Sequence, residues 1–191
     1  MEREILLTGI GGQGVQLAAQ VIARAALHAG RFVLSLGTYG GSMRGGDTSS
    51  TVIVGSEPIS SPPIVAEAWA ALGSHPRNWG AVRAKLRDGG LAVWDADLFT
   101  DAEAAAPEKV HALPVRATSL AASLGAPQAA SLVLVGALAG ASGLVDADAL
   151  VTAMTEALPP YRQQHVPKNS EALRAGFGAA PSGLAPAWNA P

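Results

Sequence analysis

Cysteine is absent from this chain of 191 residues, and charged residues make up only 15% of it. Without thiolates, the chain has no disulfide framework and no ligand set for an iron–sulfur cluster or a structural zinc site. Aromatic residues are scarce at 5%, whereas hydrophobic residues reach 49%. This composition is typical of a compact globular protein rather than a disordered one.

A strong net charge and a long apolar run are also lacking. The net charge is -2 and no basic stripe is present, so we expect no nucleic-acid partner. Residues 129–145 are uncharged but fall short of the ~20 apolar residues of a membrane span. We therefore expect no membrane segment but a helix packed against a sheet, with Gly136, Ala139 and Gly140 permitting close approach. The acidic start of the chain, Met1 to Glu4, is unlike a secretory signal and predicts a cytoplasmic location.

Glycine is abundant, and one glycine cluster follows a short apolar stretch at the start of the chain. Residues 3–8 are expected to form a buried strand, and Gly9, Gly11 and Gly14 then fit the pattern G-x-G-x-x-G before a helix that begins at Val15. The free N–H groups at such a helix start can bind an anion. The same pattern also fits a tight turn with no ligand.

The pattern G-x-G-x-x-G also occurs in dinucleotide-binding proteins, and this possibility can be tested further along the chain. NAD-binding domains carry an Asp or Glu about 20 residues beyond the glycines, at the end of the second strand. Residues 31–36 are the expected second strand, but no acid occurs between Glu4 and Asp47. The sequence therefore argues against NAD.

A second glycine-rich loop, residues 37–47, follows that strand and precedes an expected third strand at 48–54. The loop carries Tyr39, Met43 and Arg44, and loops of this kind commonly hold binding residues on a rigid scaffold. Alternatively, Arg44 is a surface cation that pairs with Asp47, which stabilises the fold by about 0–1 kcal/mol.

The rest of the chain alternates between strand and helix patterns and then becomes helical. This order predicts an α/β fold: a three-layer, Rossmann-like domain with a mostly parallel sheet and a helical C-terminal part. We assign residues 1–178 to this domain and residues 179–191 to a flexible C-terminal tail. The expected strands are 66–72, 91–94 and 110–115; the expected helices are 76–86, stopped by Asp88-Gly89-Gly90, then 118–124, 128–139, 146–158 with Asp146 as N-cap, and 167–175 with Gly176 behind it.

No catalytic set is evident. The four histidines fall on separate elements without metal-ligand spacing, and neither a G-x-S-x-G elbow nor the G-K-[ST] ending of a P-loop is present. Asp95 and Asp97 follow an expected strand, where they are either a cation site or simply solvated. We predict a binding scaffold with no catalytic residue and no metal site of its own.

Two glycine motifs at this separation resemble a known family. Residues 9–15, GIGGQGV, follow the first strand, and Tyr39-Gly40 with Met43-Arg44-Gly45-Gly46 follow the second. Together they resemble the gamma subunit, or gamma domain, of the 2-oxoacid:ferredoxin oxidoreductases, which act on pyruvate, 2-oxoglutarate, branched-chain 2-oxoacids or indolepyruvate. The resemblance covers about residues 3–178. This chain departs from the family pattern at Gly41-Ser42, where Pro-Glu is usual, and at Ser131, where Asn is common.

The resemblance implies a non-autonomous enzyme subunit. Its partners would be alpha and beta subunits that hold thiamine diphosphate and Mg, and a ferredoxin-type subunit or free ferredoxin with iron–sulfur clusters. Such a complex oxidises a 2-oxoacid to carbon dioxide and acyl-CoA, and we expect this chain to help form the coenzyme A pocket at an interface. The expected cofactor-binding residues are Gly9, Gly11, Gly12, Gln13, Gly14, Tyr39, Met43, Arg44, Gly45 and Gly46.

Two alternatives remain open at this stage. The chain could be a free-standing nucleotide-binding oxidoreductase that uses NAD or a flavin. It could also be a non-catalytic assembly subunit that stabilises a complex without contributing to turnover.

Overall fold

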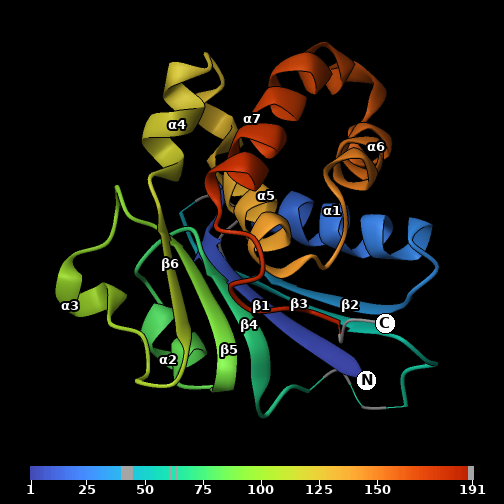
Figure 1. Ribbon diagram of the computed structural model, residues 1–191. Coiled ribbons are helices and arrows are strands. Elements are labelled where there is room, and N and C mark those ends of the chain that lie inside the picture. Colours follow the sequence, from blue (N-terminus) through green and yellow to red (C-terminus); the bar gives the residue numbers. More distant parts are fainter. Residues whose placement is uncertain (40–44, 61, 63, 189–191) are drawn as a thin grey trace.

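A six-stranded sheet forms the centre of the computed structural model, which describes residues 1–39, 45–60, 62 and 64–188 (Figure 1). The strands lie in the order β2-β3-β1-β4-β5-β6. Their bounds are Glu2–Ile10 for β1, Phe32–Tyr39 for β2, Asp47–Gly55 for β3, Ala68–Gly73 for β4, Leu86–Asp95 for β5 and His111–Val115 for β6.

The sheet is mostly parallel, as the sequence predicts. β1 pairs in parallel with β4, β4 with β5 and β5 with β6. β3 lies between β1 and β2 and pairs antiparallel with both. Because β3 runs against its neighbours, it starts at the edge of the sheet where β1 ends, and Ile10 lies opposite Asp47.

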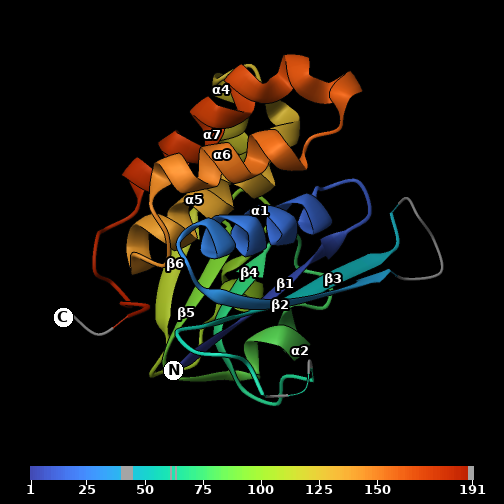
Figure 2. The ribbon, with the colours of Figure 1, turned by 90° about the vertical axis from the view of Figure 1, so that its right-hand side faces the viewer.

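The helices cover the two faces of the sheet unequally. α1 and α5 lie on one face with α4, α6 and α7 beyond them, whereas the short α2 and α3 lie on the other side (Figures 1 and 2). All six residues of β4 are buried, as expected for a strand covered on both faces. The helix bounds are Val15–His28 for α1, Trp79–Arg83 for α2, Asp101–Ala104 for α3, Ala117–Ser123 for α4, Ala130–Ser142 for α5, Ala147–Ala157 for α6 and Val166–Ala179 for α7, with 3-10 turns η1 at Pro127–Ala129 and η2 at Pro160–His165.

The uncharged stretch near residue 135 forms α5, the central helix of the core. Every residue from Ser131 to Ser142 is buried. Within the described residues, no helix is long and apolar enough to cross a membrane. Gly136 and Gly140 do allow close approach, but the neighbour is α7 rather than the sheet, because a Cβ on either would meet the backbone of Leu173 or Phe177.

Several expected boundaries are confirmed. α1 ends at His28 with Gly30 at φ 72° just beyond, so Gly30 occupies the left-handed position that stops many helices. Asp146 caps α6, because its side chain accepts a hydrogen bond from the Ala149 N–H at 2.7 Å.

The helix predicted at 76–86 is wrong. Only the five residues of α2 are helical there, and Leu86 already begins β5. Gly89 and Gly90 therefore lie within a strand and do not end a helix. Gly90 is needed because a Cβ would lie 2.7 Å from the Trp69 carbonyl oxygen, next to a register shift between β4 and β5.

The C-terminal region also differs from the prediction. Gly176 lies inside α7 rather than behind it. A glycine is needed at this position because a Cβ would meet the Val133 backbone of α5. The segment after α7 is packed up to Trp188, whose indole N–H donates to the Leu144 carbonyl at 3.1 Å. Ala187 is fully buried, so the part of the expected tail up to Trp188 packs against the rest of the chain, and residues 189–191 lie outside the described residues.

Candidate functional site

The first glycine cluster forms a tight turn between β1 and α1. Gly12 and Gly14 have φ values of 105° and 77°, and Gly14 is the N-cap of α1. Gly9 has no room for a side chain, because a Cβ would lie 2.8 Å from Val15 Cγ2. The Gln13 side-chain oxygen accepts a hydrogen bond from the Ile10 N–H at 3.0 Å. Gln13 thus holds the shape of the turn.

The structure brings the two glycine motifs into contact. The Gly11 N–H donates to the Gly46 carbonyl at 2.8 Å, and the Gly45 N–H donates to the Gly11 carbonyl at 3.2 Å. Arg77 supports this junction, because its guanidinium donates to the Gly45 carbonyl at 2.9 Å. The turn after β1 and the end of the second glycine loop are therefore one continuous backbone surface.

Part of the second glycine loop lies outside the described residues. Tyr39 is the last residue of β2, and Met43 and Arg44 belong to the segment that the structure does not describe. The alternative in which Arg44 pairs with Asp47 therefore stays a prediction. In the structure, the Asp47 carboxylate lies 3.7 Å from the Arg77 guanidinium.

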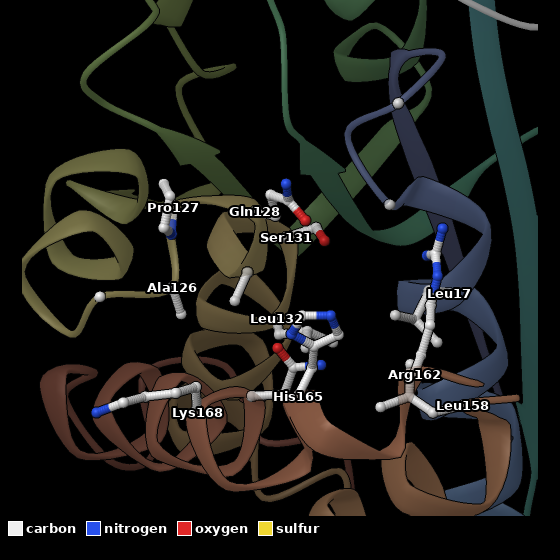
Figure 3. A pocket seen from close by; sticks show the side chains of 15 residues that line it. Leu17, Ala126, Pro127, Gln128, Ser131, Leu132, Leu158, Arg162, His165 and Lys168 are labelled. Carbon is white, nitrogen blue, oxygen red and sulfur yellow. The ribbon is translucent and has the colours of Figure 1, made fainter. Parts of the chain in front are cut away.

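A cavity of about 630 Å³ opens beside the glycine turn (Figure 3). Three elements enclose it: the start of α1, the segment that leads into α5, and the segment η2 with the start of α7. Arg162 and His165 extend into it from η2, and Lys168 lies along the wall that α7 forms (Figure 3). It is lined by Gly12, Gly14, Leu17, Gly125, Ala126, Pro127, Gln128, Ala129, Ser131, Leu132, Leu158, Arg162, His165, Lys168 and Asn169.

The lining of this cavity favours an anion. Two permanent cations and one histidine line it, and none of its described lining residues is Asp or Glu. The volume lies in the range of about 300–1,000 Å³ that is usual for small-molecule sites. The cavity can therefore take a ligand of cofactor size with negative charge.

A second cavity of about 230 Å³ adjoins the first at the carboxyl ends of β1, β4 and β5. Ser74, which follows β4, lines it and is 5% exposed. Its hydroxyl has no hydrogen-bond partner within the described part of the chain. A buried hydroxyl without a partner is costly, so this atom is a candidate ligand contact.

Comparison with known proteins identifies the family. The model of the pyruvate ferredoxin/flavodoxin oxidoreductase family matches residues 4–179. The chain belongs to this family. Among curated proteins, the 2-oxoglutarate synthase subunit KorC of Methanocaldococcus jannaschii is 28% identical over 183 residues, with 94% of this chain and 95% of that subunit covered. The predicted resemblance to the gamma type is confirmed.

Solved structures agree with this assignment. The gamma subunit of a keto/oxoacid ferredoxin oxidoreductase from Geobacter sulfurreducens matches with a TM-score of 0.76 at 26% identity, covering 93% of this chain and 95% of that one. A 2-oxoglutarate:ferredoxin oxidoreductase from Magnetococcus marinus matches with a TM-score of 0.80 at 21% identity. The match covers 95% of this gamma-type chain but only 32% of that longer one, and it shows a shared fold.

Two aspartates at the end of β5, Asp95 in its last position and Asp97 just beyond, have a structural role in this gamma-type chain. Asp95 is 1% exposed and accepts hydrogen bonds from the Ala117 and Thr118 N–H groups and the Thr118 hydroxyl at the start of α4. Asp97 accepts from the Ser119 N–H at 2.6 Å. These carboxylates satisfy the free N–H groups at the start of α4. The sequence alternative in which both acids are simply solvated is therefore wrong.

Asp97 also carries a perturbed pKa. Burial tends to raise the pKa of this carboxyl, but the hydrogen bonds from Ser119 and from the Arg116 guanidinium outweigh that effect and hold the pKa below its usual value. No group of three or more His, Cys, Asp or Glu residues that could hold a metal ion occurs among the described residues.

Sequence reasoning missed the cationic wall of the cavity. Arg162, His165 and Lys168 lie more than 140 residues after the glycine turn and belong to no motif with it. In the sequence, His165 lies on a different element from each of the other histidines and has no metal-ligand spacing to them, yet it lines the cavity. Only the packing of α7 on α5 brings this segment opposite the glycines.

Proposed function

We propose that this chain is the gamma subunit of a complex that oxidatively decarboxylates a 2-oxoacid to acyl-CoA, and that its glycine-turn cavity contacts coenzyme A. The main support is that the two glycine motifs are hydrogen-bonded to each other beside a cavity. Cations line this cavity, and none of its described lining residues is a carboxylate. Coenzyme A bears three phosphate groups, so it suits such a lining. Coenzyme A and succinyl-CoA are bound in the Magnetococcus marinus oxidoreductase, which supports the proposal by analogy of fold.

The residues of this chain would bind and orient the cofactor rather than react with it. Gly12 and Gly14 present bare backbone, so a phosphate can approach closely, and the start of α1 at Gly14 adds the positive end of a helix dipole. Arg162 and Lys168 supply charge on the opposite wall. Met43 and Arg44 remain further candidates from the sequence.

The chemistry of carbon–carbon cleavage would come from partner subunits. Thiamine diphosphate, when bound there, stabilises the carbanion that decarboxylation produces. Iron–sulfur clusters also belong to partners in this proposal, because the chain has no cysteine. The partners are alpha and beta subunits together with a ferredoxin-type subunit or free ferredoxin.

The proposal is tested by co-purification with the tagged chain from its native host, followed by an acyl-CoA assay with pyruvate, 2-oxoglutarate, branched-chain 2-oxoacids and indolepyruvate. We expect thiamine-binding subunits and coenzyme A-dependent activity on one of these acids. The isolated chain should show no turnover.

Two outcomes would count against the proposal, and a third would narrow its site. A chain that purifies alone and binds NAD or a flavin would support a free-standing oxidoreductase. A complex that keeps its full turnover rate without this chain, and loses only stability, would make it an assembly subunit. Unchanged coenzyme A dependence after Arg44→Ala would remove Arg44 from the site.

A further inference from the structure

The two cavities form one elongated site. Both are lined by Gly12, Pro127, Gln128 and Ser131, so they meet where the glycine turn faces the start of α5. The larger cavity extends from this junction toward α7 and is here called the outer chamber. The smaller one extends toward the end of β4 and is called the inner chamber. A ligand longer than either chamber can therefore span both.

The outer chamber is the cationic end. Arg162 and His165 extend into it (Figure 3), and Lys168 forms part of its wall. Lys168 lies 2.9 Å from Glu171, and both side chains are about half exposed. Such an exposed pair is weak, so the Lys168 ammonium can exchange this carboxylate for a bound phosphate.

The inner chamber favours an uncharged group. Asp95 lines it, and its carboxylate is already committed to the start of α4. A ligand anion placed beside this carboxylate would be repelled, whereas a neutral amide would not. The unpartnered Ser74 hydroxyl can donate to an amide carbonyl or accept from an amide N–H.

We propose that the double cavity orients coenzyme A: the phosphate-bearing adenosine end lies in the outer chamber against Arg162, His165 and Lys168, and the pantetheine amides lie in the inner chamber against Ser74. This inference rests on the proposed function, since it takes coenzyme A as the ligand. It adds the direction in which the ligand lies and two further contact residues, His165 and Ser74.

The test uses the assembled complex and two halves of the ligand as probes, adenosine 3′,5′-bisphosphate and pantetheine, with binding measured by calorimetry. The double variant Arg162→Gln, Lys168→Gln should weaken bisphosphate binding at least about tenfold, because charge-assisted hydrogen bonds are lost, and leave pantetheine binding unchanged. Ser74→Ala should do the reverse and weaken pantetheine binding about three- to tenfold.

Matched variants control for general effects. Arg174→Gln removes a cation from the same helix, α7, where Arg174 pairs with Asp148 away from the cavity. Ser123→Ala removes an exposed hydroxyl that bonds to the Leu120 carbonyl. Both controls should bind both probes as the wild-type complex does.

Two results would overturn the orientation. The first is that bisphosphate binding is unchanged in the double variant and pantetheine binding is unchanged in Ser74→Ala. The second is that the effects are exchanged, so that the double variant weakens pantetheine binding and Ser74→Ala weakens bisphosphate binding. In either case coenzyme A itself still binds the wild-type complex. Failure of the wild-type complex to bind coenzyme A would refute the coenzyme A part of the proposed function together with the orientation, while subunit co-purification would still test the assignment to a complex.

Discussion

Gly176→Ala gives a sharp test of how α5 and α7 pack. In the interior of a helix, Ala is favoured over Gly by about 1 kcal/mol, so propensity alone predicts a more stable protein. The structure predicts the opposite. A Cβ at Gly176 would lie 2.8 Å from the Val133 carbonyl carbon and 2.9 Å from its Cα, and it would be closer still to the carbonyl oxygen. These are backbone atoms of a buried helix, so they cannot move aside as a flexible side chain can.

The expected magnitude follows from these two effects. Overpacking costs about 1–3 kcal/mol, and the contact with rigid backbone places this site near 3. Subtracting the gain in propensity leaves a loss of about 2 kcal/mol in the free energy of unfolding. For a domain of this size, that lowers the melting temperature by about 4–8 °C.

Gly178→Ala is the matched control, because it lies two residues further along α7 and a Cβ there would meet no atom within 4 Å. It should be neutral or stabilise the protein by up to about 1 kcal/mol. Urea unfolding followed by circular dichroism compares the two variants. If Gly176→Ala were as stable as the wild type, the close contact between α5 and α7 would be refuted.

Three further changes have defined outcomes. Asp97→Asn should destabilise the protein by about 1 kcal/mol near pH 7. Because the folded-state pKa of Asp97 is lowered, this difference is fully present above the ordinary carboxyl pKa and decreases as the pH falls below it. Urea unfolding of both proteins at neutral and acid pH would measure the decrease. Trp188→Ala removes a hydrogen bond to Leu144 and a ring that lies 4.0 Å from the Arg31 guanidinium, so the melting temperature should fall by about 4–8 °C for a loss of about 2 kcal/mol. Gly12→Ala places a side chain on a backbone with φ 105°, although a Cβ there would meet no atom within 4 Å. The chain should therefore fold with a loss of about 1–2 kcal/mol in the free energy of unfolding, while the KM of the complex for coenzyme A rises. An unchanged KM would contradict the place of Gly12 in the site.

Local patterns predicted much of the fold. The apolar run before Gly9 forms most of β1, the uncharged stretch forms the buried helix α5, and Asp146 caps the start of α6. These features depend on neighbours in sequence, such as periodicity, caps and glycine stops. Because glycine often ends a helix, the sequence predicts helix ends at Gly90 and Gly176, but in the structure each glycine is required by a close tertiary contact. That contact involves residues far away in sequence, and no local rule contains it.

The site shows the same division. Both glycine motifs could be identified from the sequence, but not the reason they meet. That reason is the antiparallel strand β3: because it lies next to β1 and runs the opposite way, its first residue lies beside the last residue of β1, and the loop before it must join the turn after β1. The hydrogen bonds between Gly11 and the pair Gly45-Gly46 continue this pairing by one step. An all-parallel sheet would put the start of the third strand at the far edge, roughly 30 Å away for strands of nine residues. The direction of one strand thus determines whether the two motifs can act on one ligand.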